Sequence, residues 1–447
     1  MAGPAALLKV LRQSIALLLL FASNSWALDW DLALELEGRS FYELEPAQHS
    51  GSVAATLELF QRWNRRREIL VAELFLREDA DDPSRSHGDV RELYYHHIAR
   101  EAEFRIGARR VYWGVTESRH LVDIINQSDL VEDIDGEAKL GQPMFNTTFI
   151  GDWGSFDFFL MPYARARTFP GADGLPQLPF PVAVAEAQYE SSRQQTHLDS
   201  ALRWRSSIGS ADIGISFFHG TAREPLLLPC LRRGSGFEGT ENGPNCDPES
   251  AIPDPGPLPE QVIALLQTLG LAPSNEEVEQ QILDAIVLVP RYELIDQLSL
   301  DAQYIIGATA LKLEARLRRQ FGRWNLATVS GFEHTFGDVA GSGIDVGLLA
   351  EYLYEERGTL LGSRFDDDWF AGMRLGFNDI AGTQVLAGGI VEADARNRLF
   401  SVEASRRLGN NWRLALEARI FSAIPEDDPL AFFADQDHLR LELTRYF

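Results

Sequence analysis

Apolar and polar residues alternate strictly near the end of the chain, with a period of two. Phe400, Val402 and Ala404 share one face of a segment whose other face is polar. The same alternation recurs from Leu414 to Ile420 and from Leu439 to Leu443. Because successive side chains of a β-strand point to opposite faces, these segments are predicted to be strands with one apolar and one polar face.

Similar segments of about ten residues, the length that a tilted strand needs to cross a bilayer, follow one another along most of the chain. Before the three C-terminal segments, the predicted strands are 29–41, 52–61, 67–76, 90–98, 103–112, 143–151, 155–163, 198–206, 211–219, 297–306, 310–320, 325–336, 344–355, 369–378 and 383–394. The total is about eighteen, with sixteen as the alternative. Tight turns such as 64–66 and 208–210 alternate with long links such as 113–142 and 220–296. This alternation predicts an antiparallel transmembrane β-barrel, which has short turns at one end and long loops at the other.

Most tryptophans fall at or near the ends of predicted strands. They are Trp30, Trp63, Trp113, Trp153, Trp204, Trp324, Trp369 and Trp412. Amphipathic aromatic side chains prefer the two membrane interfaces and flank the apolar band of a barrel. A soluble periplasmic β-protein is the alternative, and its tryptophans would more often lie mid-strand in a core.

The beginning of the chain has the order of a secretory signal. Lys9 and Arg12 precede an apolar run at 15–22, and the small-x-small group Ser25-Trp26-Ala27 follows. This order predicts a signal peptide over 1–27, cleaved near Ala27, and a mature barrel over 28–447. An uncleaved anchor is the alternative, although the run is shorter than the roughly 20 residues of a membrane helix. Barrels of the Gram-negative outer membrane characteristically end in a terminal Phe after an amphipathic strand, as here at Phe447.

The strongly acidic composition limits the partners of the chain. The formal net charge of −25 becomes −27 after cleavage, with 39 basic against 66 acidic residues. Such a chain does not attract nucleic acid. The partners that we expect are outer-membrane lipid, lipopolysaccharide and small solutes.

The link 220–296 is predicted to have structure of its own. Cys230 and Cys246 both lie in it, and in an oxidising compartment they are expected to form a disulfide that closes a short loop. Apolar residues at 262–269 and 278–286 follow a helical period, and Ser274 with Glu277 fits a capping box. We therefore expect an extracellular cap with two short helices. It either shields the loops or acts as a lid over a substrate path.

If the apolar faces contact lipid, the charged residues on the opposite faces line the interior, because charge on the lipid face is unfavourable. The pore-lining candidates are Arg105, Arg109, Arg203, Arg205, Arg316, Arg318, Arg374, Arg419, Arg440, Glu351, Glu417 and Glu442. The alternative is that arginines and carboxylates on the inner face merely pair and make the wall rigid.

The link 113–142 is strongly acidic and is predicted to fold inward and narrow the pore. The constriction candidates are Glu117, Asp123, Asp129, Glu132, Asp133 and Asp135. The stretch 117–126 is expected to form a short helix with His120 and Asp123 one turn apart. Acidic groups set against an arginine wall would create a transverse field across the constriction. An acidic surface loop with no part in permeation is the alternative.

The sequence contains no pattern that indicates catalysis, a cofactor or a metal. No Gly-x-Ser-x-Gly elbow, His-Glu-x-x-His helix or phosphate loop occurs. His96 and His97 are the best catalytic candidates, but as neighbours on a strand only one of them can face the lumen. The protein is therefore predicted not to be an enzyme.

Several stretches resemble a family of uncharacterised proteobacterial outer-membrane porin-like barrels. They are PRYELIDQL at 290–298, GDVAGSGIDVGLLAEYLYEERG at 337–358, FDDDWFAGMRLGFND at 365–379, FSVEASRRLGNNWRLALEARIF at 400–421, and the final RLELTRYF. The resemblance covers roughly the last third of the chain and implies an exported outer-membrane barrel. It supplies no catalytic motif and no functional residue.

Together these patterns predict a porin-like channel for passive diffusion of small hydrophilic or amphiphilic solutes. The second hypothesis is a non-conducting scaffold or binding barrel that works with an envelope transport partner.

Overall fold

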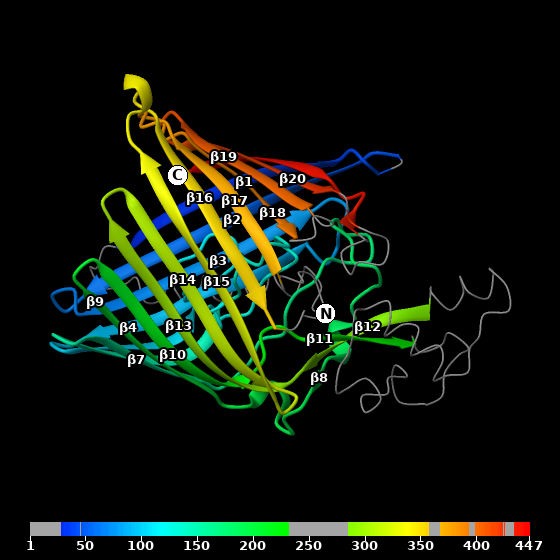
Figure 1. Cartoon of the computed structure of the whole chain (residues 1–447). Coiled ribbons are helices and arrows are strands. Elements are labelled where there is room, and N and C mark those ends of the chain that lie inside the picture. Colours follow the sequence, from blue (N-terminus) through cyan, green and yellow to red (C-terminus); the bar gives the residue numbers. More distant parts are fainter. Residues whose placement is uncertain are drawn as a thin grey trace.

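In the computed structural model the chain forms one closed antiparallel β-barrel of eighteen strands (Figure 1). The structure describes residues 28–44, 46–231, 285–356, 367–392, 398–422, 424 and 433–447. Each barrel strand pairs with its neighbours along the chain, and β1 pairs with β21 to close the cylinder. The predicted count of eighteen strands is therefore confirmed.

The first half of the barrel consists of the strands up to β10. They are β1 (Asp29–Phe41), β2 (Gln48–Trp63), β3 (Glu68–Asp79), β4 (His87–Ile98), β5 (Ala102–Arg109), β6 (Gln142–Gly151), β7 (Gly154–Met161), β9 (Asp199–Ile208) and β10 (Ala211–Thr221). The second half consists of the strands from β13 onward. They are β13 (Leu294–Ile306), β14 (Thr309–Gln320), β15 (Arg323–Phe336), β16 (Asp345–Glu355), β17 (Asp367–Gly376), β18 (Gln384–Glu392), β19 (Arg398–Leu408), β20 (Trp412–Ser422) and β21 (His438–Tyr446).

The two-residue period of the sequence places the side chains. On β5, Phe104 and Ile106 are exposed on the outside, whereas Arg105 between them bonds to interior partners. On β21, Leu439 and Leu441 are exposed outward and His438 is buried inward. Apolar side chains thus cover the outer surface of the cylinder, as predicted.

One end of the barrel carries the short turns and the other carries the long loops. Turns at the short end contain residues in the left-handed region, where glycine has no steric penalty, such as Gly209 (φ 63°) and Gly307 (φ 59°). Both chain ends described here, at β1 and β21, lie at this short-turn end. Trp30, Trp153 and Trp324 are exposed at strand ends, as expected of interfacial tryptophans.

A small second sheet lies at the long-loop end and was not predicted. It consists of β11 (Leu226–Leu231), β12 (Ile286–Tyr292) and β8 (Gln188–Tyr189). Ile286 begins strand β12, so its assignment to a helix was wrong. The remaining parts of the two predicted helices lie outside the described residues, as do the signal peptide and Cys246. The predicted disulfide therefore stays a prediction, with Cys230 buried in β11.

The short 3-10 helices η1 (Val184–Glu186), η2 (Gln194–Thr196) and η3 (Val339–Gly341) complete the described elements. Within the described residues, no helix has the length and apolar character needed to cross a membrane.

Candidate functional site: the barrel interior

The twelve pore-lining candidates lie on the inner faces of their strands. Most of them pair with carboxylates or with other interior groups. Arg203 bonds to Asp301 at 2.9 Å, and Arg205 bonds to Asp157 at 3.2 Å. Arg316 contacts Glu355, and Arg318 donates to Gln297 at 2.8 Å. Many of the pore-lining candidates therefore pair on the inner face, as the alternative of a rigid, charge-paired wall expects.

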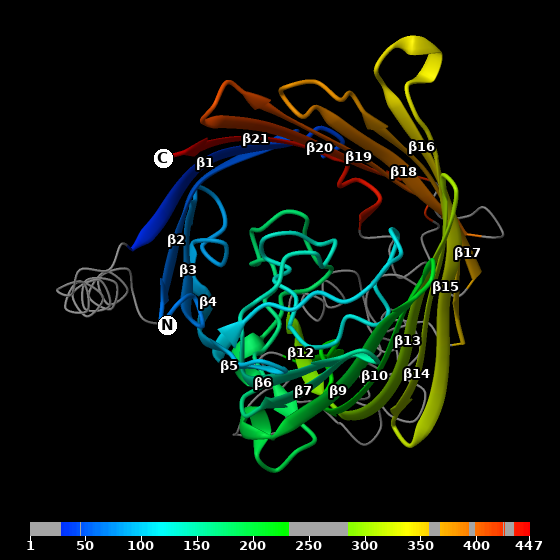
Figure 2. The same ribbon diagram turned by 90° about the vertical axis from the view of Figure 1, so that its left-hand side faces the viewer.

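The chain between β5 and β6, residues 110–141, lies inside the barrel and is called the inner loop below (Figure 2). In Figure 2 its cyan trace, together with green segments from 162–198, crosses the ring of strands. All six constriction candidates belong to the inner loop. Their role in narrowing a pore stays a prediction.

Two wall carboxylates hold the first part of the inner loop. The Glu314 carboxylate on β14 accepts hydrogen bonds from the backbone N–H of Val115 at 2.7 Å and Thr116 at 3.1 Å. The Glu351 carboxylate on β16 accepts from the backbone N–H of Glu117 and Ser118, both at 2.8 Å, and from the Ser118 hydroxyl at 2.5 Å. Since hydrogen bonds to a charged acceptor are roughly twice as strong as neutral ones, these carboxylates fix the loop to the wall. Glu351 was predicted to line the pore, but here it anchors the loop.

Ion pairs hold the far part of the inner loop against the opposite wall, and we call this set the latch. Asp133 contacts Arg419 on β20 at 2.9 Å and Arg440 on β21 at 2.6 Å. Asp135 contacts Arg419 at 2.8 Å. Glu417 contacts both arginines from the wall side. The loop acids therefore touch the arginines directly and do not face them across open water.

The two carboxylates that the inner loop contributes to the latch have opposite pKa shifts. Burial opposes ionisation of Asp133, but Arg419 and Arg440 outweigh it and lower its pKa to about 2. Burial and the neighbouring Asp133 charge raise the pKa of Asp135 to about 6. The pair therefore holds one firm negative charge and one that titrates near neutrality.

The other constriction candidates are also paired. Glu117 contacts Arg374 at 2.7 Å, and Asp123 contacts Lys139 at 3.5 Å. Asp129 accepts from the Thr168 hydroxyl at 2.6 Å. Glu132 contacts Arg77 on β3 at 3.0 Å, a partner that sequence reasoning missed. Arg77 lies two residues beyond the buried Phe75, so the period of two alone places it inside.

The predicted helix at 117–126 does not form, and the segment consists of turns and bends. Its backbone donors bond to Glu314 and Glu351 of the wall, which replace the bonds of a helix. His120 lies 3.3 Å from Glu137 and 3.6 Å from Glu314. Burial lowers the pKa of His120, but these two carboxylates outweigh it and raise the pKa to about 10.

Part of the interior is apolar, so the charged residues predicted to line it share it with an apolar cluster. Trp113 is only 6% exposed and packs edge-on against Phe159, with ring centroids 5.7 Å apart. The predicted position of Trp113 at the membrane interface was therefore wrong. The shared cluster joins Val111, Trp113, Val122, Ile124 and Ile125 of the inner loop to Met144, Phe159, Met161, Ala201, Phe218, Ala222 and Ile295. This core fills the side of the barrel formed by β6 to β13.

Open space on the other side of the barrel includes three cavities lined by described residues. An outer cavity of about 370 Å³ is lined by Arg39, Asp79 and Asp173 among others. An inner cavity of about 380 Å³ lies against β17 to β21 and includes Arg374, Arg413, Ala415, Glu417, Arg440 and Glu442. Between them is a gap of about 10 Å³, lined by Arg39, Glu132, Asp133, His438 and Arg440. That volume holds about one water molecule.

The gap has lining residues in common with both cavities. It shares Arg39 with the outer cavity and Arg440 with the inner cavity. We call it the constriction. Its loop side is made by Glu132 and Asp133, two of the six predicted constriction residues.

The histidine candidates separate as the period of two requires. His96 faces inward and lies 3.2 Å from Glu103, whereas His97 faces outward and lies 3.0 Å from Glu68. In the part of the chain that the structure describes, no group of three or more His, Cys, Asp or Glu side chains is arranged to hold a metal ion.

Comparison with known proteins finds similarity to solved structures only. No family model and no curated protein matches the chain. OpdQ of Pseudomonas aeruginosa is 9% identical with a TM-score of 0.49, over 95% of this chain and 98% of that one. OccK11 (OpdR) of the same organism is 11% identical with a TM-score of 0.47, over 94% and 95%. A mutant of the Rh. blastica porin is 10% identical with a TM-score of 0.40, over 94% and 100%.

These identities and scores are too low to assign the chain to a family. The strand pairing of the chain itself establishes the barrel fold. The interior described above is the basis for proposing a function. The resemblance to uncharacterised porin-like barrels therefore stays an expectation.

Proposed function

We propose that the protein is an outer-membrane channel for passive diffusion of small hydrophilic or amphiphilic solutes. The observation that carries this proposal is the row of three cavities along β1 to β3 and β17 to β21, with charged groups along its length. A path lined by charge stabilises water and polar solutes, which an apolar bilayer excludes. The constriction then selects for small solutes and admits larger ones only when the latch opens.

The outer surface supports placement in a membrane. Large apolar side chains such as Leu36, Ile106 and Ile215 are 44–59% exposed on the outside of the barrel, which would be unfavourable in water. A closed barrel leaves no unpaired strand edge in the bilayer. We place the short-turn end in the periplasm and the long loops outside the cell, in the outer membrane of a Gram-negative bacterium. This arrangement follows export with signal cleavage near Ala27.

No catalytic step, cofactor or metal forms part of this proposal. Lipid and lipopolysaccharide surround the barrel, and the solutes are its transient partners.

The test is single-channel recording in planar bilayers. Wild-type protein should give discrete conductance steps. Ala415→Trp fills the inner cavity and should reduce the step size. Ala418→Trp is the matched control, because Ala418 lies on the outer face of the same strand. Equal conductance of the two variants would contradict the path along β20.

A second candidate is a non-conducting scaffold that works with an envelope transport partner. The narrowness of the constriction, about 10 Å³, and the apolar core on the β6–β13 side favour it. Folded wild-type protein that gives no conductance steps at any voltage would support the scaffold and overturn the channel.

A further inference from the structure

Four arginines gather on two neighbouring turns at the short-turn end of the barrel. Arg65, Arg66 and Arg67 form the turn between β2 and β3, and Arg100 lies in the turn between β4 and β5. The two turns are adjacent, because the Ile98 N–H donates to the Arg67 carbonyl at 2.8 Å. We call these four residues the arginine patch.

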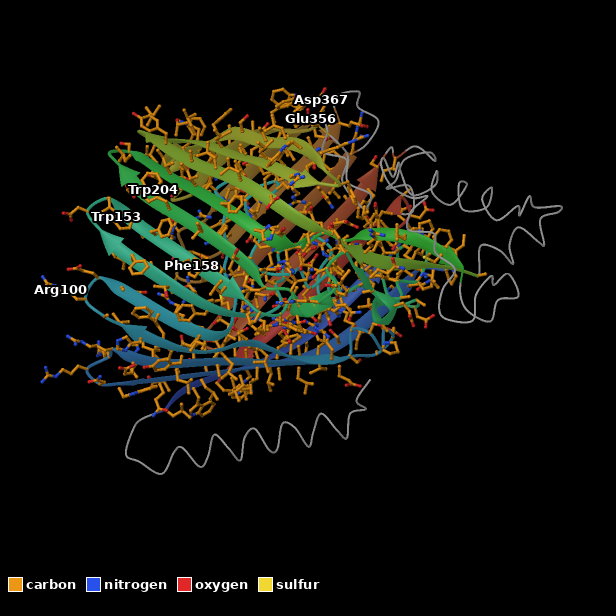
Figure 3. All side chains as sticks on the ribbon, turned by 90° about the horizontal axis from the view of Figure 1, so that it is seen from below. Arg100, Trp153, Phe158, Trp204, Glu356 and Asp367 are labelled. Atoms are coloured by element: carbon orange, nitrogen blue, oxygen red, sulfur yellow. The ribbon has the colours of Figure 1, made fainter. Side chains whose placement is uncertain are left out.

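The patch is exposed and poorly neutralised. The Arg100 side chain is 94% exposed and projects at the tip of its turn (Figure 3). Its nearest carboxylate, that of Glu101, is 3.8 Å away and 78% exposed itself. Arg65, Arg66 and Arg67 are exposed, and none of them forms an ion pair with any described residue.

The next carboxylate along the chain, that of Glu68, already bonds to other side chains. Glu68 accepts from Asn64 at 3.3 Å, and it also contacts Tyr95 and His97. This leaves the guanidinium groups of the patch free to bind an anion from outside the chain.

The two turns of the arginine patch differ in charge from the other short turns at the same end of the barrel. Eight short connections lie at this end, all of them among the described residues. The other six, at 152–153, 209–210, 307–308, 337–344, 377–383 and 409–411, contain neither lysine nor arginine. In a chain of net charge −25, such local concentration of positive charge is not explained by composition.

The patch also borders the apolar outer surface. Trp63 and Tyr95 face outward directly beside it, with ring centroids 6.1 Å apart. Tyr95 is 36% exposed, and Phe104 on the next strand is also 36% exposed. Amphipathic aromatics of this kind mark the level of lipid head groups, so the arginines lie where head-group phosphates would be.

We propose that the arginine patch binds the phosphate of an anionic phospholipid in the leaflet at the short-turn end. The acyl chains of this lipid would lie against the outward Trp63, Tyr95 and Phe104. Guanidinium groups suit this role because they bind phosphate oxygens through forked pairs of N–H donors. The inference rests on the proposed membrane location but not on conduction.

The test is native mass spectrometry of the purified barrel in detergent, titrated with phosphatidylglycerol or with phosphatidylcholine of the same acyl chains. Wild-type protein should retain phosphatidylglycerol in preference to phosphatidylcholine. The triple variant Arg65→Glu, Arg66→Glu, Arg100→Glu should bind phosphatidylglycerol about tenfold more weakly or worse, since each basic residue near a membrane surface contributes appreciably to anionic lipid binding.

The matched control is Arg319→Glu, which reverses an exposed arginine at the opposite end of the barrel. It should bind phosphatidylglycerol as the wild type does. Wild-type protein without preference for phosphatidylglycerol, or a triple variant with undiminished binding, would overturn the inference. Equal affinity for glycerol phosphate alone would also overturn it, because the acyl chains would then play no part.

Failure of this inference and failure of the proposed function would give different experimental results. A silent but lipid-selective barrel rejects conduction and keeps the lipid site. A conducting barrel without lipid preference does the reverse.

Discussion

A substitution that opens the latch would test most directly whether the constriction controls conductance. In Asp133→Asn the amide keeps the size of the side chain but removes the charge that joins Arg419 and Arg440. The pKa of Asp133 falls from 3.8 to about 2 in the folded protein, which corresponds to stabilisation of the ionised group by about 2 kcal/mol. Loss of that contribution should raise the ratio of open to closed latch about 30-fold.

The assay is single-channel recording with a salt gradient across the bilayer. The variant should show larger or more frequent open steps and a reversal potential shifted towards anion selectivity, because one negative charge leaves the constriction. Asp152→Asn is the matched control, since Asp152 is exposed in the turn between β6 and β7. If conductance and reversal potential of Asp133→Asn equal those of the wild type, the latch does not control the path.

Three further outcomes are expected from the same structure. Glu351→Ala should free the 117–118 backbone donors and increase current noise from loop motion, because each lost bond to a charged acceptor is worth about 1.5–3 kcal/mol. Acidification from pH 7 to pH 5 should close the wild-type channel more often. The pKa of Asp135 is about 6 in the attached loop against 3.8 when released, so protons favour the attached state by about 1 kcal/mol at pH 5, and Asp135→Asn should remove this pH dependence. His96→Ala should leave any lipid or peptide hydrolysis unchanged at background level, and a measurable activity lost in this variant would contradict the non-enzymatic assignment.

The barrel wall was predictable because each wall strand is defined by its own two-residue period. Strand β1 was predicted with the bounds that it has, Asp29–Phe41. Strand β2 extends to Gln48–Trp63, beyond the predicted 52–61, since pairing with β1 at its start and with β3 at its end continues where the apolar alternation has ended. Local pattern therefore gives the existence of a wall strand better than its ends.

The small sheet escaped prediction because its strands lack alternation. Strand β12 begins Ile286-Val-Leu-Val, and all four residues are buried. A strand covered on both faces has a continuous apolar run, which periodicity cannot distinguish from part of a buried helix. Pro229 within β11 also argues against a strand on local grounds.

The partners of the inner loop could not be predicted from local sequence pattern, for a different reason. Asp133 and Arg440 are 307 residues apart in sequence, and no period relates them. The acidic composition of the loop and the arginines of the wall together predicted that the two would meet. Which acid meets which arginine depends on the path of the loop, and that path is set by Glu314, Glu351 and the apolar cluster around Trp113.

Direct pairing changes what the interior charges can do. Acids facing arginines across open water would produce a transverse field. In direct contacts such as that of Asp133 with Arg440 at 2.6 Å, the two opposite charges largely cancel, so they produce little field at a distance. The inner cavity keeps Glu403 and Arg413, which form no ion pair among the described residues, and Glu442, which bonds only to Thr444. Two unpaired carboxylates against one arginine leave a small negative excess at the inner mouth. If the protein conducts as proposed, paired charges fix the shape of the path and these few unpaired ones determine which ions it favours.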